Sequence, residues 1–219
     1  MVASAEYFEN AVRGERAKVY RMPENSVYWY VLRVRYGTEE RVVESLKEKL
    51  DKHSFRPFIP QKTHTFRRKG EVSYFQKKCF PCYIFVESDK PEGEFIRDVF
   101  PVVYRMKDTR KFLSYDAVDV EDEGEGEEGC IYEEIANRSI ALHEADRLVL
   151  NSFLGEDRCI GVSKICKDGD IVSIVSGPLM GFESKILKIS KKNKEAIVAV
   201  EMHGKTVPVS VALEFVENK

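Results

Sequence analysis

Two cysteines separated by two residues, Cys79 and Cys82, are the pair in this chain whose spacing could support chemistry. A CxxC pair serves thiol–disulfide exchange when it opens a helix, because the helix N-terminus lowers the pKa of one thiol. Here the pair leads into Tyr83-Ile84-Phe85-Val86, a run of aromatic and β-branched residues that predicts a strand. A zinc site would need two more ligands, but the other cysteines stand alone and the four histidines are scattered. We therefore expect no enzyme activity, no metal and no other cofactor.

Composition indicates a folded protein of one or two domains. The chain has 219 residues, of which 43% are hydrophobic and 33% are charged. Five cysteines without a disulfide framework, no apolar run of membrane-spanning length and no signal peptide predict a cytoplasmic protein without a membrane partner. The net charge of -2 conceals segregation, because ten acidic residues lie between Asp116 and Glu134, and the rest of the chain is basic. A basic remainder is compatible with a nucleic-acid partner.

The first half of the chain predicts helices set against a largely antiparallel sheet. Residues 1–25 show no clean period and are expected to form an N-terminal extension to a domain over residues 26–155. Its expected elements, in order, are a strand over 28–35, a helix over 39–50, a short strand at 58–60, a hairpin over 63–75, a strand over 80–86, a helix over 92–99, a strand over 102–106 and a helix over 143–154. The acid- and glycine-rich residues 116–134 are expected to form a surface loop.

The strand after the cysteine pair has two unlike faces. Alternation places Ile84 and Val86 on one side and Tyr83 and Phe85 on the other. In one interpretation a helix covers the two aromatic residues, so that the strand is buried on both faces. In the other, the aromatic side chains are exposed for a partner. Short apolar runs do not distinguish these alternatives.

Two groups of basic residues could contact nucleic acid. The first surrounds the predicted hairpin and consists of Lys62, Arg67, Arg68, Lys69, Lys77 and Lys78, with Glu71 as the one acid among them. It is either a solvated edge that resists unwanted strand pairing or an arm near nucleic acid. The second group, Lys185, Lys188, Lys191, Lys192 and Lys194, falls within ten residues without an acid. It either keeps a small domain soluble or faces the phosphates of a folded RNA.

The C-terminal part predicts a separate small barrel. Residues 156–167 are expected to form a linker, and residues 168–219 a domain of short strands separated by turn signals such as Gly177-Pro178 and His203-Gly204. The expected strands are 170–176, 182–189, 195–202, 206–211 and 213–216.

Residues 27–219 resemble the NusG family of transcription elongation factors. Phe80-Pro81-Cys82-Tyr83-Ile84-Phe85-Val86 is similar to the family's Phe-Pro-Gly-Tyr-Val-aliphatic-Val signature, and Gly177-Pro178-Leu179-Met180-Gly181-Phe182 is similar to the start of a KOW domain. Ser176 to Gly181, Gly161-Val162-Ser163 and the basic hairpin resemble the specialised LoaP antiterminators. The resemblance implies an α+β fold: an N-terminal NGN α/β sandwich linked to a five-stranded SH3-like KOW barrel. Cys82 stands where the family has Gly, so we expect the turn to use positive φ less freely.

The resemblance also implies partners. RNA polymerase would bind an exposed patch of Phe80, Tyr83 and Phe85, and the factor would favour the polymerase's closed, pause-resistant state. Upstream DNA would lie near Arg33 and Arg35. A nascent leader RNA hairpin would contact the KOW domain, in our prediction at Lys185, Lys188, Lys191 and Lys192. The alternative is a general NusG-type elongation or pausing factor whose KOW domain binds termination or ribosomal proteins; in both cases we expect a monomer.

Overall fold

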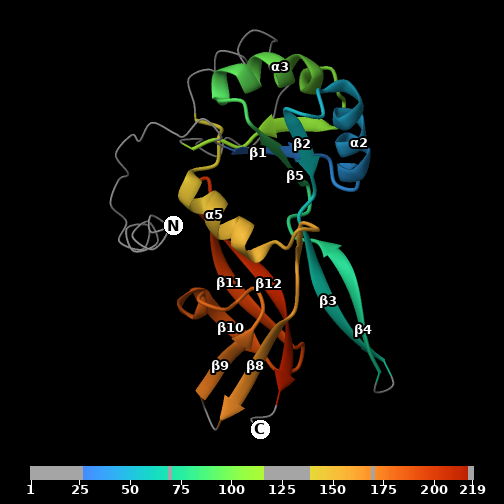
Figure 1. The fold of residues 1–219 in the computed structure, drawn as a ribbon. Coiled ribbons are helices and arrows are strands. Elements are labelled where there is room, and N and C mark those ends of the chain that lie inside the picture. The colour runs from blue at the N-terminus through green and yellow to red at the C-terminus, as the bar shows by residue number, and fades with distance from the viewer. Residues whose placement is uncertain (1–26, 69–70, 116–138, 169–170, 217–219) are drawn as a thin grey trace.

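The computed structural model describes residues 27–68, 71–115, 139–168 and 171–216. The predicted N-terminal extension, residues 1–25, and the predicted acidic loop, residues 116–134, lie outside the described residues. In Figure 1 a sheet with two helices lies at one end and a strand-rich part at the other, with one helix between them and a long hairpin projecting beside the strand-rich part.

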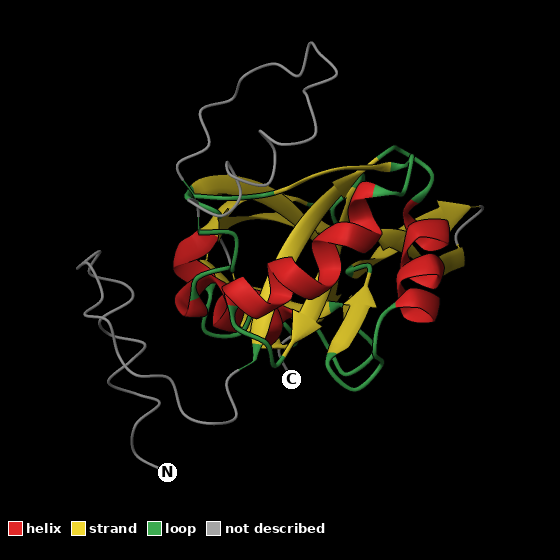
Figure 2. Ribbon diagram, turned by 90° about the horizontal axis from the view of Figure 1, so that it is seen from above, coloured by secondary structure: helices red, strands yellow, loops and turns green. Residues whose placement is uncertain are grey.

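The N-terminal sheet has four strands in the order β2-β5-β1-β6. They are β1 (Tyr28–Val34), β2 (Phe55–Phe58), β5 (Tyr83–Ser88) and β6 (Thr109–Phe112). Helices α2 (Glu39–Lys49) and α3 (Glu92–Tyr104) pack on one face of this sheet, as Figures 1 and 2 show. The core between helices and sheet contains Tyr30 and Leu32 of β1, Ile84 and Val86 of β5, and Phe95 of α3. The alternation predicted for β1 and β5 is therefore confirmed on this face.

The strand predicted over residues 102–106 is wrong, because these residues end a helix. Phe95, Val99 and Val103 follow helical spacing and are all buried, so the apolar stripe carries α3 to Tyr104. Pro101 lies inside this helix. The sheet's last strand, β6, follows at Thr109–Phe112 and pairs with β1.

The projecting hairpin consists of β3 (Gln61–Arg68) and β4 (Glu71–Lys78), as predicted. It belongs to a separate three-stranded sheet, in which β3 also pairs in parallel with β7 (Cys159–Ile160). Strand β7 lies within the predicted linker, so part of that linker is held against the hairpin.

The C-terminal part is a five-stranded sheet in the order β10-β11-β12-β8-β9. Its elements are β8 (Ser163–Asp168), β9 (Ile171–Ser176), the 3-10 helix η1 (Glu183–Lys185), β10 (Ile186–Ser190), β11 (Glu195–Met202) and β12 (Lys205–Val216). Two boundaries differ from the prediction. The sheet begins at Ser163, inside the predicted linker, and the last two predicted strands are one strand. Strand β12 changes neighbour at Ala212, pairing with β11 before it and with β8 after it, which explains the two apparent runs.

Helix α5 (Glu144–Phe153) lies between the two sheets (Figure 1). Its Leu150 and Phe153 are buried in an apolar cluster that also holds Trp29 and Phe85 of the N-terminal sheet and Val198 of β11. The two domains therefore share one continuous core. No helix among the described residues is long and apolar enough to cross a membrane.

Candidate functional site

The second face of the N-terminal sheet is built from aromatic rings. Trp29 of β1 lies with its ring centroid 5.3 Å from Phe58 of β2 and 6.0 Å from Phe85 of β5. Phe85 in turn lies 5.6 Å from Phe58 and 5.7 Å from Phe80. These rings come from three adjacent strands and the turn before β5, because alternation directs every second side chain away from α2 and α3. We call Trp29, Phe58, Phe80, Tyr83 and Phe85 the aromatic face.

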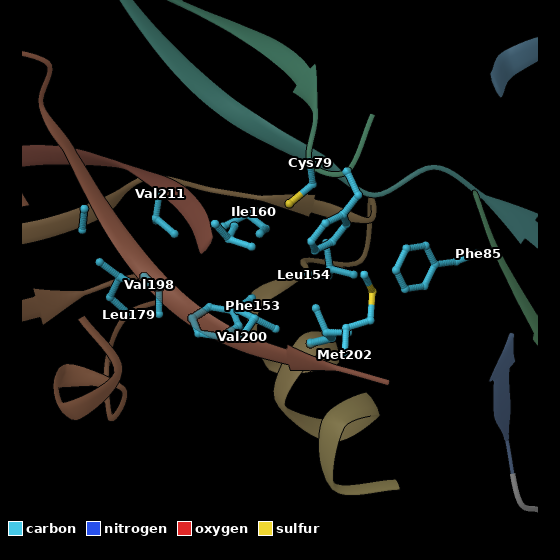
Figure 3. Close-up of a cluster of buried hydrophobic side chains, with 14 of the residues drawn as sticks. Cys79, Phe85, Phe153, Leu154, Ile160, Leu179, Val198, Val200, Met202 and Val211 are labelled. Carbon is cyan, nitrogen blue, oxygen red and sulfur yellow. The ribbon is translucent and has the colours of Figure 1, made fainter. Parts of the chain in front are cut away.

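The aromatic face is covered, so the predicted exposure of Phe80 and Phe85 is wrong. Phe85 is 0% exposed, Phe80 is buried and Tyr83 is half-buried. Later parts of the chain complete the apolar cluster that buries this face: Leu150 and Phe153 of α5, Leu154 and Ile160 after it, and Val200 and Met202 of β11. Figure 3 shows the Met202 side chain next to the ring of Phe85 at one end of this cluster. Alternation along the strands predicted the direction in which the rings point. It could not predict that they are buried, because the residues that bury them lie far away in the sequence.

Arg158, which lies between α5 and β7, binds to the aromatic face. Its guanidinium carbon lies 4.6 Å from the ring centroid of Phe58 and 5.4 Å from that of Trp29. Its Nη2 donates to Oε2 of Glu87 at 2.6 Å. Glu87 also accepts from Nε1 of Trp29 at 2.9 Å and from Nε of Arg56 at 2.8 Å. Burial alone would raise the pKa of Glu87, but these donors and the Arg158 charge hold it below its ordinary value.

A second contact joins the turn between β11 and β12 to the N-terminal domain. His203 is buried there, and its Nε2 donates to the carbonyl oxygen of Ile140 at 3.2 Å. Its ring centroid lies 4.8 Å from that of Tyr115, which stacks on His143 at 3.6 Å. The Tyr115 hydroxyl donates to Asp146 of α5 at 3.0 Å. Burial lowers the pKa of His203 to about 4, so the neutral imidazole is the form that fits this site.

A third contact joins the base of the hairpin to the C-terminal sheet. Nζ of Lys62 donates to Oγ of Ser210 at 2.7 Å. Nδ1 of His64 lies 2.9 Å from Oε1 of Glu195, the first residue of β11. Both β3 residues therefore point toward the C-terminal sheet.

The turn before β5 has a structural role, and its cysteines are not placed for thiol chemistry. Cys82 has a φ of 70°, so it does take the left-handed conformation that the family signature assigns to Gly, against our expectation. Its N–H donates to Oε1 of the buried Glu39 at 2.9 Å, and Nζ of Lys78 donates to Oε2 at 2.8 Å. Cys79 is buried, and burial raises the pKa of its thiol to about 12, far from the thiolate that redox exchange needs. The described cysteines are all free thiols.

The predicted nucleic-acid residues lie in three places. Arg33 and Arg35 are exposed at the end of β1. Arg67 and Arg68 lie at the distal end of β3, paired in register with Val72 and Glu71. The third place is the barrel: Lys188 of β10 and the turn residues Lys191 and Lys192 are exposed, and Lys185 at the end of η1 is half-buried.

Comparison with known proteins shows which proteins this chain resembles. The family model described as transcription termination factor NusG matches residues 27–123. The transcription termination/antitermination protein NusG of Treponema pallidum is 27% identical over 199 residues, which covers 86% of this chain and 97% of that protein. Its namesake from Thermus thermophilus is 23% identical over 192 residues, covering 85% and 95%. The first part of this chain is thus similar to NusG, and the likeness to NusG proteins extends over most of its length.

Both relatives bear the name transcription termination/antitermination protein. The N-terminal sheet with α2 and α3 falls within the matched residues and is NusG-like, so we call it the NGN domain. The C-terminal sheet is consistent with a KOW domain, and we use that name for it. A solved structure titled "Domain interaction in Thermotoga maritima NusG" is 20% identical, with a TM-score of 0.45 over 87% of this chain and 96% of that one.

Four residues that were not predicted from the sequence also lie at these sites. Arg110 is exposed on β6, next to Arg33 of β1, and was missed because β6 was not predicted. Phe66 and Phe75 are exposed on the hairpin, where the prediction considered charge alone. The role of Arg158 carried no sequence signal, because its contacts with β1, β2 and β5 are all non-local.

Proposed function

We propose that this protein is a processive antitermination and elongation factor of the LoaP type. It binds RNA polymerase through the aromatic face of the NGN domain and a nascent leader RNA hairpin through the KOW domain. The observation that carries the proposal is that an apolar face of rings from three NGN strands is covered by segments that follow the domain in sequence. A soluble domain with such a face needs either its own cover or a partner.

The cover indicates how the partner binds. Helix α5 contributes Leu150 and Phe153 to the same apolar cluster as the rings, and an amphipathic helix is a common occupant of an apolar surface. The helices of the polymerase clamp would take the place of α5 and of Met202. The protein then exists in a closed form, with the aromatic face covered, and an open form that binds polymerase. Polymerase selects the open form because it has affinity for that form alone.

The charged residues have separate partners in this proposal. Lys185, Lys188, Lys191 and Lys192 of the KOW domain contact phosphates of the RNA hairpin, and each contact releases counterions. Arg33 and Arg35, joined by Arg110, face upstream DNA once the NGN domain is on polymerase. Recognition of RNA by shape and backbone is compatible with lysines on a turn.

The alternative function is that of a general NusG-type factor whose KOW domain binds a termination or ribosomal protein. One observation favours it: Met180 and Leu187 of the KOW domain are large apolar side chains that are mostly exposed. Exposed apolar side chains at the centre of a patch are common in protein interfaces.

Transcription by purified RNA polymerase on paired templates distinguishes the two functions. The templates carry a terminator, with or without a leader that encodes an RNA hairpin. We expect the protein to increase readthrough only on the hairpin template. Equal readthrough on both templates would support the general factor, and no effect on either, with no polymerase binding, would contradict both functions.

A further inference from the structure

The structure brings together two basic groups that are far apart in the sequence. The turn that carries Lys191 and Lys192 leads directly into Glu195, the first residue of β11. Glu195 contacts His64 of β3, with 2.9 Å between Oε1 and Nδ1. The ring of His64 lies 5.0 Å from that of Phe75 on the neighbouring strand β4. A chain of contacts therefore links the KOW lysines to the hairpin.

One side of the hairpin carries exposed aromatic rings. Lys62, His64 and Phe66 share a side of β3, because side chains two residues apart point the same way. Their side also holds Phe75, which pairs with His64 in register, and Lys77, which pairs with Lys62. Contacts of Lys62 with Ser210 and of His64 with Glu195 identify it as the side turned toward the KOW domain.

Both rings are nevertheless partly exposed to solvent. Phe66 is 50% exposed and Phe75 is 41% exposed. Nζ of Lys77 lies 5.1 Å from the Phe75 ring centroid, so a positive charge stands beside an accessible ring face. Aromatic rings flanked by cations along a strand are the arrangement that binds single-stranded nucleic acid, where bases stack and phosphates pair with the cations.

We propose that Phe66, Phe75 and Lys77 of the hairpin, with Lys191 and Lys192 of the KOW turn, form one surface for RNA that spans both domains. Unpaired bases stack on Phe66 and Phe75, while the lysines hold phosphates of the adjoining stem. This proposal rests on the proposed RNA-binding function and adds to it a second element of the ligand, a single-stranded segment next to the hairpin. Single-stranded segments beside stems are where proteins stack RNA bases on aromatic side chains.

The test measures fluorescence anisotropy of labelled RNA with the full-length protein. Four probes are used: a stem-loop, the same stem-loop with an oligouridine tail, the stem-loop with an oligodeoxythymidine tail, and the free oligouridine, each tail of about ten nucleotides. The variant is Phe66→Ala with Phe75→Ala. Its matched control is Tyr74→Ala, which removes an equally exposed ring (54%) from the opposite side of the same hairpin.

We expect the tail to strengthen binding to the native protein and to Tyr74→Ala. In Phe66→Ala/Phe75→Ala the gain from the tail should fall by about tenfold or more, with affinity for the bare stem unchanged. Because stacking involves no phosphate, the salt dependence of binding should stay the same in that variant and should weaken in Lys191→Ala/Lys192→Ala.

Three results would overturn the proposal: a tail effect that persists in Phe66→Ala/Phe75→Ala, an equal loss in Tyr74→Ala, or tighter binding of a deoxythymidine tail, which would assign the surface to DNA. A different result would show that the proposed RNA-binding function itself is wrong. If the bare stem does not bind the native protein, the KOW lysines are not its site, and the free oligouridine still tests stacking on the two rings.

Discussion

Arg158 offers the most direct test of the closed form. It lies between α5 and the KOW domain in sequence, and its guanidinium contacts two rings of the aromatic face and Glu87. The substitution Arg158→Ala removes these contacts and leaves the NGN core intact. Glu87 keeps hydrogen bonds from Arg56 and Trp29, so no unpaired buried charge results. The closed form should therefore weaken without unfolding of the domain.

The size of the effect follows from the contacts. Stacking of a cation on rings at 4.6 and 5.4 Å contributes about 1 kcal/mol. The ion pair at 2.6 Å is partly screened, because the Arg158 side chain is 30% exposed, and contributes about 1 kcal/mol. The closed form then loses about 2 kcal/mol, which is roughly 30-fold in the equilibrium between closed and open forms. While the open form stays a minor population, the apparent affinity for polymerase rises by the same factor.

A titration of labelled protein with RNA polymerase measures this affinity. The matched control is Arg56→Ala, because Arg56 donates to the same carboxylate at 2.8 Å but lies on β2, within the NGN domain. Arg56→Ala should leave the apparent affinity close to that of the native protein. An affinity unchanged in Arg158→Ala, or raised equally in Arg56→Ala, would refute the idea that this contact holds the cover in place.

Three further predictions address the other sites. Tyr83→Ala removes a half-buried ring and should weaken polymerase binding with little change in melting temperature. Phe85→Ala removes a fully buried ring and should lower the free energy of unfolding, measured by denaturant titration, by about 3 kcal/mol or more. Lys191→Glu with Lys192→Glu should weaken binding of a leader RNA hairpin in a gel-shift assay and leave polymerase binding unchanged. Burial lowers the pKa of His203 from 6.5 to about 4, so the undocked form binds the proton more readily. The closed form should therefore lose stability as pH falls from about 6.5 toward about 4. In thermal melts, His203→Gln should lack that part of the pH dependence.

Each of these predictions has an opposite outcome that would contradict it. A large stability loss in Tyr83→Ala would make that ring part of the core. Unchanged RNA binding after the double lysine reversal would remove the KOW turn from the RNA site. A melting profile of His203→Gln that follows the native protein between about pH 7 and about pH 5 would show that this imidazole does not govern docking.

Local pattern was sufficient for most elements of the fold. The alternation in β1 predicted both of its faces, since Trp29 and Val31 lie in one apolar cluster and Tyr30 and Leu32 in the other. Strand β11 has the predicted bounds, because its buried and half-buried residues alternate without interruption. In these elements the local period and the tertiary environment agree.

Elements that depend on distant partners were missed. Strand β8 is stabilised by parallel pairing with the end of β12, about fifty residues away. Its own residues include two lysines and an aspartate, so they show no clear strand pattern, and residues 163–167 were assigned to the linker. The cover of the aromatic face has the same origin. Nothing in residues 79–86 specifies that Leu154 and Met202 will pack against Phe85, so the sequence left exposure and burial as equal alternatives.

The order of these segments along the chain has a consequence for synthesis. Every ring of the aromatic face has been translated by residue 85, but α5 begins at Glu144 and β11 at Glu195. Translation adds roughly 5–20 residues per second, so a growing NGN domain spends several seconds on the ribosome without its cover. Each new molecule thus passes once through a stage in which the face is accessible and no docking contact has to be broken, and a polymerase nearby could engage it then.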